Sequence, residues 1–243
     1  MKWIPRGLAR YSVDGMHHYI AGEKVLLLDA AQSYEVEFLD DSGTESFCLF
    51  FSNALLRDAS IDAAGRKTAQ FADMVFAPPP DLSAALRASR RSLAQANLAV
   101  ATFEERLLTV LASTVALGAE HRRLAERVPA SRAETRRRLL SRLQRAREMI
   151  EDCAERPPDL TQLAEASALS KFHLLRLFAE TFGATPHEYA QRRRVERAKD
   201  LLRHSQLSIL RIAETLGYES QSAFARRFRR HTGTTPRAFR SGK

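Results

Sequence analysis

An internal repeat in the C-terminal third of this 243-residue chain constrains its fold more than any other feature. The stretch that begins at Leu163 matches the stretch that begins at Ile212 at an offset of 49 residues, and from Ser170 onward the offset is 50. Because the change of register falls between two helical stretches, the pattern predicts two helix-turn-helix units in tandem. The matched pairs are Leu163/Ile212, Ala164/Ala213, Glu165/Glu214, Ser170/Ser220, Leu174/Phe224, Arg176/Arg226, Phe178/Phe228, Gly183/Gly233, Thr185/Thr235 and Pro186/Pro236.

Residues that begin and end helices support both copies. Asp159 and Gln162 have the spacing of a capping box at the start of the first copy. Ser170 can cap the second helix of that copy, and Gly183 can end it. The pair Thr185-Pro186 predicts the start of a linking helix. The units are therefore expected over about 160–183 and 208–233, joined by a helix over about 186–204.

The second helix of each unit is expected to carry the DNA-contacting side chains. The N-terminal part of such a helix enters the major groove, where Arg reads guanine and Gln reads adenine. An alternative is that the arginines of this helix form only a solvated face. Arg227 and Arg230 are expected to contact phosphate or to be structural. The candidate DNA-binding residues are Lys171, Phe172, Leu175 and Arg176 in the first unit and Gln221, Ser222, Ala225, Arg226, Arg229 and Arg230 in the second.

The charge of the chain changes along its length. The whole chain has 38 Lys and Arg against 29 Asp and Glu, a formal net charge of +9. Residues 1–80 have a net charge of −4, residues 81–156 of +5, and residues 157–243 of +8. A basic C-terminal end indicates that a polyanion binds there rather than at the acidic front.

Residues 160–240 resemble the DNA-binding domain of the AraC/XylS family of bacterial transcription regulators. The residues that carry the resemblance are Leu163-Ala164, Ser170, Leu174, Arg176, Phe178, Gly183, Pro186, Tyr189, Arg194, Arg197-Ala198, Leu201-Leu202, Ile212-Ala213, Gly217-Tyr218, Phe224, Arg226, Phe228, Gly233, Thr235-Pro236 and Arg240. These residues cover about a third of the chain.

The resemblance implies a sequence-specific regulator that binds double-stranded promoter DNA and contacts RNA polymerase. It leaves the operator open, and also the choice between activator and repressor. Leu175 stands where some members of the family carry a polar residue, so the first unit is expected to read thymine methyl groups there, or little at all. The base-reading positions of the family fall on Phe172, Leu175, Arg176, Gln221, Ser222 and Arg226.

Residues 1–80 are predicted to form a small β-rich domain, so the fold class is α+β. Alternating residues on both sides of Asp14-Gly15 predict a hairpin, and Tyr34, Val36 and Phe38 alternate in a further strand. The apolar run from Ser46 to Phe51 is interpreted as a fully buried strand. This part is similar, more loosely, to the cupin-like sensor domain of many family members, which implies an effector, either a small molecule or a regulatory protein.

Residues 81–130 are predicted to be helical, and residues 131–243 to form the DNA-binding domain. From Phe103, positions spaced alternately four and three residues apart form a heptad seam, with Leu107, Val110, Leu117 and Leu124 among them. The seam predicts a homodimer. The alternative is that this helix packs only within its own chain.

Several classes of function are excluded at this stage. No catalytic cluster is visible, so we expect no enzyme, and no cofactor is assigned. Metal is not expected either, because the adjacent His17 and His18 point to opposite faces of a strand; one should lie inside the domain and the other in water. Cys48 and Cys153 are interpreted as core residues. The longest charge-free stretch, 107–119, is too short to span a membrane, which predicts a cytoplasmic protein.

Overall fold

The computed structural model describes residues 1–13, 15–28, 32–52, 54–56, 58–59, 74–93 and 100–242. The chain divides into two compact units, Met1–Ser141 and Arg142–Lys243. Helix α4 (Ala133–Asp152) crosses the boundary between them. Within the described residues, no helix combines the length and the apolar character that crossing a membrane would need.

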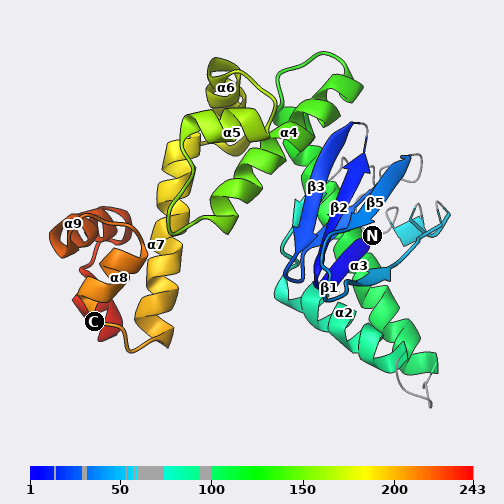
Figure 1. Ribbon diagram of the computed structural model, residues 1–243, viewed down its shortest axis with the longest axis horizontal. Helices are drawn as coiled ribbons and strands as arrows, with labels where there is room; N and C mark the ends of the chain where they lie inside the picture. The colour runs from blue at the N-terminus through cyan, green and yellow to red at the C-terminus, as the bar shows by residue number, and fades with distance from the viewer. Residues whose placement is uncertain are drawn as a thin grey trace. The chain divides into compact units, whose positions relative to one another are not determined.

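The N-terminal unit contains two antiparallel sheets (Figure 1). The first has the strand order β6-β1-β4-β7 and the second the order β3-β2-β5. The predicted hairpin is confirmed, because Val13 pairs with Met16 and the register continues along both strands; Asp14 lies outside the described residues. The strands are β1 (Lys2–Arg6), β2 (Leu8–Val13), β3 (Met16–Ala21), β4 (Val25–Leu27), β5 (Tyr34–Phe38), β6 (Glu45–Cys48) and β7 (Met74–Phe76).

Helices α2 (Pro80–Leu93) and α3 (Val100–Arg127) complete the core of this unit. Trp3 and Val110 are fully buried and belong to one apolar cluster with residues of β4 and α2. Along the predicted seam of α3, Val110, Thr114 and His121 are buried within the chain itself. These three positions therefore need no second subunit to cover them, which agrees with the alternative that the helix packs within its own chain. The homodimer stays a prediction.

The prediction of a fully buried strand over Ser46–Phe51 is wrong. Strand β6 ends at Cys48, and Phe50 is 78% exposed. Phe47, Leu49 and Phe51 are partly buried against the core, whereas Cys48 and Phe50 between them are exposed. The physical reason is that β6 lies at the edge of its sheet and packs with one face only, so the side chains alternate with the period of two that a strand imposes.

The two histidines behave as expected, and the two cysteines do not. His18 is 3% exposed and faces the interior, whereas the neighbouring His17 is exposed. Both cysteines are exposed, which corrects their interpretation as core residues. Cys48 points away from the core on the edge strand β6, and Cys153 follows the last residue of α4.

The C-terminal unit is all helical, as the sequence predicted. Helix α7 lies between the pair α5–α6 and the pair α8–α9 (Figure 1, yellow). In the second pair, Phe224 and Phe228 are fully buried against Val195 and Leu202 of α7. After α4, the helices are α5 (Leu160–Ala166), α6 (Lys171–Phe182), α7 (Pro186–His204), α8 (Ile209–Thr215), α9 (Gln221–Thr232) and α10 (Pro236–Arg240).

Candidate nucleic-acid interface

Side-chain caps fix where the second helix of each unit begins and ends. Ser170 Oγ accepts a hydrogen bond from the backbone N–H of His173 (3.3 Å), and Ser220 Oγ accepts one from Ala223 (3.1 Å). At the far ends, Gly183 and Gly233 have φ angles of 72° and 80°. Only glycine adopts this left-handed conformation without strain, and it ends a helix sharply. The two helices α6 and α9 are therefore 12 residues each and closely matched.

The exposed face of α6 carries all four residues predicted for the first unit. Lys171, Phe172, Leu175 and Arg176 are exposed, while Leu174, Leu177 and Phe178 on the other side are buried. Phe172 is 76% exposed and Leu175 38% exposed. Because residues three and four apart are neighbours on a helix, Phe172, Leu175 and Arg176 form one continuous surface. This surface is apolar at its centre and has a single guanidinium at its edge.

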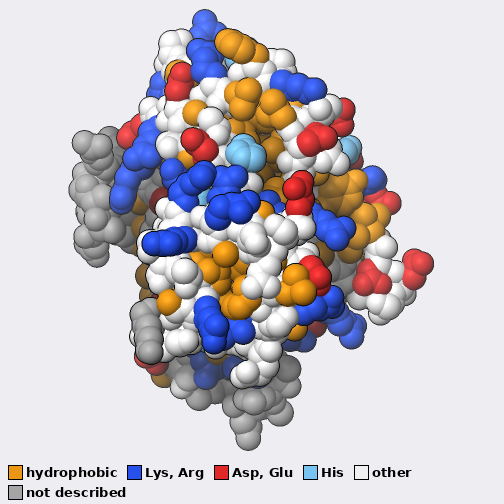
Figure 2. Space-filling view, turned by 90° about the vertical axis from the view of Figure 1, so that its left-hand side faces the viewer, with side chains coloured by type: hydrophobic (Ala, Val, Ile, Leu, Met, Phe, Trp, Pro, Cys, Tyr) orange, Lys and Arg blue, Asp and Glu red, His pale blue; other side chains and the backbone are white. Residues whose placement is uncertain are grey.

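The exposed face of α9 has a different chemistry. Gln221, Ser222, Arg226, Arg229 and Arg230 are exposed, and Ala225 between them is half-buried. Arg226, Arg229 and Arg230 make no ion pair or side-chain hydrogen bond with the residues that the structure describes, and the same is true of Arg176 on α6. Guanidinium groups without a carboxylate partner are available to an anionic ligand. The face of the molecule drawn in Figure 2 shows Lys and Arg side chains more prominently than acidic ones.

Other arginines of this unit are engaged within the protein. Arg211 on α8 lies 2.8 Å from a carboxylate oxygen of Glu214, and Arg197 on α7 lies 3.7 Å from one of Glu155. The exposed Arg192, Arg193, Arg237 and Arg240 also form no ion pair among the described residues, so an unpaired guanidinium is not confined to α6 and α9. Arg227, which was expected to contact phosphate or to be structural, is half-buried.

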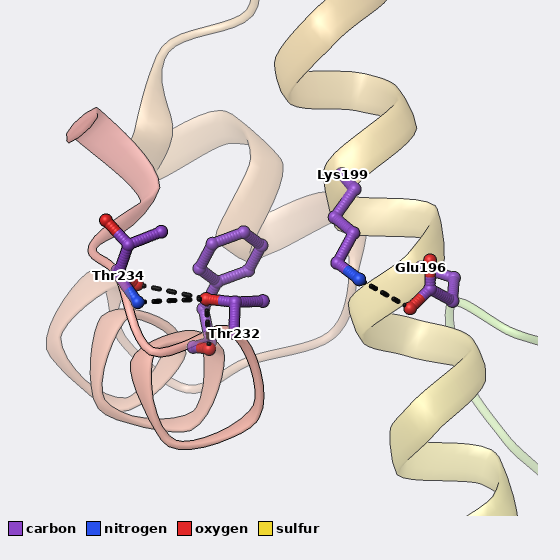
Figure 3. Close-up of polar contacts among 5 residues, drawn as sticks. Glu196, Lys199, Thr232 and Thr234 are labelled. Atoms are coloured by element: carbon purple, nitrogen blue, oxygen red, sulfur yellow. Dashed lines mark hydrogen bonds and ion pairs between the residues drawn. The ribbon is translucent and has the colours of Figure 1, made fainter. Parts of the chain in front are cut away.

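The side-chain hydroxyl of Thr232 makes hydrogen bonds at the C-terminal end of α9 (Figure 3). Thr232 Oγ1 donates to the carbonyl oxygen of Phe228 (2.9 Å) and accepts from the backbone N–H of Thr234 (3.4 Å). On α7, Lys199 Nζ donates to Glu196 Oε1 (2.7 Å). These bonds hold the last turn of α9 and a turn of α7 without using any of the predicted DNA-contacting side chains.

Arg194 joins the linking helix to the turn of the second unit, and sequence reasoning assigned it no structural role. Its Nε donates to the carbonyl oxygen of Leu216 (3.0 Å), and its Nη2 donates to the same oxygen. The guanidinium carbon lies 4.4 Å from the centre of the Tyr218 ring. Burial lowers the pKa of Arg194 from its usual value. The family resemblance includes Arg194 and not Arg192 or Arg193 beside it, but no local pattern in the sequence indicated these contacts.

Gly217 brings the segment before the first unit into the same contact. Its φ angle is 68°, and a Cβ at this position would lie 3.1 Å from the carbonyl oxygen of Glu155. The residues around Arg194 therefore connect α7, the turn of the second unit and the chain that leads into the first unit. These contacts lie within the C-terminal unit and link its two helix-turn-helix units.

The described residues offer no site that would obviously hold a metal. No group of three or more His, Cys, Asp or Glu side chains lies close enough together for that purpose in this part of the chain. The candidate interface is built from cations, one amide, one hydroxyl and apolar side chains, which suit phosphates and base edges.

Comparisons with known proteins identify a helix-turn-helix domain in the C-terminal unit. Residues 163–242 match a family model described as a helix-turn-helix domain. The chain is 42% identical over 78 residues to a probable transcription factor PqrA of Proteus vulgaris, covering 32% of this chain and 64% of that protein. It is 34% identical over 91 residues to the multiple antibiotic resistance protein MarA of Escherichia coli, covering 37% of this chain and 72% of that protein.

A solved structure is also similar to part of the chain. It is a transcriptional regulator from Chromobacterium violaceum described as containing an AraC-type DNA-binding domain, 31% identical, with a TM-score of 0.40; it covers 41% of this chain and 89% of that one. Among the curated relatives, the chain spans 64% of the Proteus vulgaris protein, 35% of a probable regulator LumQ of Photobacterium leiognathi and 29% of the regulator YfiF of Bacillus subtilis.

Proposed function

Since the chain belongs to the AraC/XylS family of bacterial transcription regulators, we propose that it binds double-stranded promoter DNA in a sequence-specific manner through α6 and α9. The observation that carries the proposal is that the capped second helix of each unit has an exposed face whose arginines are not paired with a carboxylate among the described residues. These arginines are Arg176 on α6 and Arg226, Arg229 and Arg230 on α9, where Gln221 and Ser222 are exposed as well.

The length of α7 supports reading of two successive major grooves. The helix has 19 residues, which at about 1.5 Å per residue is roughly 28 Å. Successive major grooves on one side of B-DNA are about 34 Å apart. A rigid linker of this length, joined to the second unit by Arg194, suits the placement of α6 in one groove and α9 in the next.

The proposal assigns distinct roles to the exposed residues. Arg226 and Gln221 lie toward the start of α9 and are assigned to guanine and adenine edges, and Arg176 has the corresponding role on α6. Phe172 and Leu175 contact the methyl groups of thymine. Ser222 is assigned to base edges together with Gln221 and Arg226. Lys171 and Arg230 bind phosphate, and Ala225 and Arg229 lie beside the base-reading residues on the exposed face of α9.

The N-terminal unit is proposed to receive an effector and to change the affinity for DNA. Its β-rich architecture suits a sensor, and the effector is a small molecule or a regulatory protein. Self-association as a homodimer and contact with RNA polymerase belong to the same proposal. Sedimentation at several concentrations tests the homodimer. A wild-type protein that remains monomeric at high concentration would contradict this part of the proposal.

Genome-wide mapping of bound DNA, followed by affinity measurements on the mapped site, tests the DNA contact. Arg226→Ala and Arg176→Ala should each weaken binding to the cognate duplex by about 1–3 kcal/mol and flatten the preference at one base position. Arg211→Ala is the matched control, because this exposed arginine on α8 is paired with Glu214. Equal loss of specific and non-specific binding in Arg226→Ala would contradict the assignment of the reading face.

A further inference from the structure

A cavity of about 420 Å³ lies in the first helix-turn-helix unit, between the start of α5, helix α6 and the start of α7. Sites for small ligands usually have volumes of about 300–1000 Å³, so this cavity is large enough for one. The elements around it belong to the C-terminal unit and can be followed in Figure 1. Most of the wall is apolar and is formed by Pro157, Pro158, Leu160, Leu163, Pro186 and Ala190.

One buried amide group in this wall has no hydrogen-bond partner. Gln191, on α7, lines the cavity and is only 8% exposed. Its Oε1 accepts no hydrogen bond from the residues that the structure describes, and its Nε2 donates none to them. Burial of an amide without hydrogen bonds is unfavourable. A ligand that supplies both a donor and an acceptor therefore gains more here than it would at a wall of satisfied groups.

The charged groups of the wall are already engaged within the protein. Arg194 donates from Nε and Nη2 to the carbonyl oxygen of Leu216. Asp159 Oδ1 accepts a hydrogen bond from the backbone N–H of Gln162 (2.9 Å) and so caps α5. His187, the remaining titratable residue of the wall, is exposed. The wall thus offers a ligand apolar surface and one amide group, and its two engaged charges call for no counter-charge.

The cavity also reaches the surface that is proposed to contact DNA. Leu175 lines it, and the same side chain is 38% exposed on the face of α6 that carries Phe172 and Arg176. A molecule that fills the cavity therefore contacts the same leucine as a thymine methyl group in the proposed complex with DNA.

From these observations we propose that the first helix-turn-helix unit binds a small, uncharged, flat compound containing a cyclic amide, and that this ligand competes with DNA at Leu175. In a cyclic amide the N–H and the C=O lie on the same side, so the N–H donates to Gln191 Oε1 and the C=O accepts from Gln191 Nε2. The rings pack on the prolines and leucines of the wall. This site is separate from the effector response proposed for the N-terminal unit, and it rests on the proposed DNA contact only for the competition.

Binding is measured by calorimetry on the full-length protein, with 2-quinolone as the probe. Coumarin is the matched ligand, because it has the same two rings and the same carbonyl group but an ester oxygen in place of the N–H. 2-Quinolone should bind saturably with one molecule per chain, and coumarin should bind at least tenfold more weakly. Absence of saturable binding by 2-quinolone, or equal binding of coumarin, would overturn the proposal. Both measurements use the wild-type protein, so they do not depend on the folding of a variant.

A pair of variants tests the position of the amide. Gln191→Leu replaces it by an apolar group of similar size and leaves no hydrogen-bond partner behind. This variant should bind 2-quinolone at least tenfold more weakly than wild type and should no longer distinguish it from coumarin. Gln144→Leu is the matched control, because Gln144 on α4 is 1% exposed and its amide also lacks a partner among the described residues, but it does not line the cavity. Unchanged binding by Gln191→Leu, or an equal loss in Gln144→Leu, would contradict the assignment.

A parallel measurement of DNA affinity keeps this proposal distinct from that of the DNA contact. Saturating 2-quinolone should weaken binding of wild type to the cognate duplex at least threefold and leave that of Gln191→Leu unchanged. If 2-quinolone binds through Gln191 and the duplex affinity of wild type does not change, the competition at Leu175 is refuted and the cavity site stands. If the protein binds no duplex specifically but still binds 2-quinolone through Gln191, the proposed DNA contact fails and the cavity site does not.

Discussion

An insertion in α7 tests whether the two helix-turn-helix units bind DNA as one rigid body. The first part of this helix belongs to the first unit, because the Tyr189 ring is centred 5.7 Å from that of Phe178. Val195 and the residues after it pack on Phe224 of the second unit. Alanines inserted after the exposed Arg192 therefore leave both apolar cores intact, and they break the contacts of Glu155 with Gly217 and Arg197 that link the two helix-turn-helix units.

The expected effect follows from helical geometry. Two added residues rotate the second unit by about 200° and move it by about 3 Å, whereas four rotate it by about 400° and move it by about 6 Å. In the two-residue variant α9 faces away from the groove, and all its base contacts are lost. Because specific binding exceeds non-specific binding by about 4 kcal/mol or more, affinity for the cognate site should fall about 1000-fold. The four-residue variant should retain part of its specificity.

Fluorescence anisotropy with a labelled cognate duplex measures this effect, and a scrambled duplex gives the non-specific level. Circular dichroism must first show native helicity in both variants. The non-specific affinity should stay close to wild type, since the arginines themselves are unchanged. Wild-type specific affinity in the two-residue variant would refute the reasoning, because it would mean that the units reach their grooves independently.

Three further predictions concern single side chains. Arg230→Ala should weaken binding to all duplexes alike and lower the slope of log affinity against log salt by about one; a loss confined to one sequence would contradict its assignment to phosphate. Gly217→Ala should destabilise the protein by about 1–2 kcal/mol, because its backbone is left-handed and the added Cβ meets Glu155, and an unchanged melting temperature would argue against the contact. Tyr189→Phe removes the 2.6 Å hydrogen bond to Glu151 and should cost about 1 kcal/mol in urea unfolding.

Tyr189 also gives a pH dependence with a definite sign. Burial, followed by the bond to Glu151, raises its pKa to about 12 from an ordinary value of 10.0. The folded state thus favours the protonated phenol, so its contribution to stability is complete below about pH 10 and is lost as pH rises toward 12. The unfolding free energy of Tyr189→Phe should fall less steeply over this interval than that of wild type.

The helical part of the fold was predictable because its signals are local. A cap such as Ser170 and a terminator such as Gly183 act within one or two turns, so their sequence spacing determines where α6 begins and ends. The exposed positions on α6 and α9 follow from the same periodicity. The role of Arg194 could not be predicted in this way, because its partners Leu216 and Tyr218 approach only through the packing of α7 against α8.

The N-terminal unit shows where sequence patterns are ambiguous. The run from Phe47 to Phe51 has the composition of a strand buried on both faces, but its position at the edge of a sheet, which leaves Phe50 exposed, is set by distant strands. In the same way, an apolar seam on α3 has the same spacing whether it meets a second subunit or its own sheet. Lys2 on β1 is only 4% exposed, and burial of a charge cannot be read from its neighbours in sequence.

Under the proposed DNA contact, the difference between the exposed faces of α6 and α9 gives the protein a direction along DNA. One face is centred on Phe172 and Leu175, and the other carries three unpartnered arginines. Since the two helices follow each other in one chain, the site proposed for each protomer consists of two unlike sequence elements in a fixed order, so that site is not itself a palindrome. Inverting such a site at a promoter would turn the whole regulator around and present its other end to the transcription start.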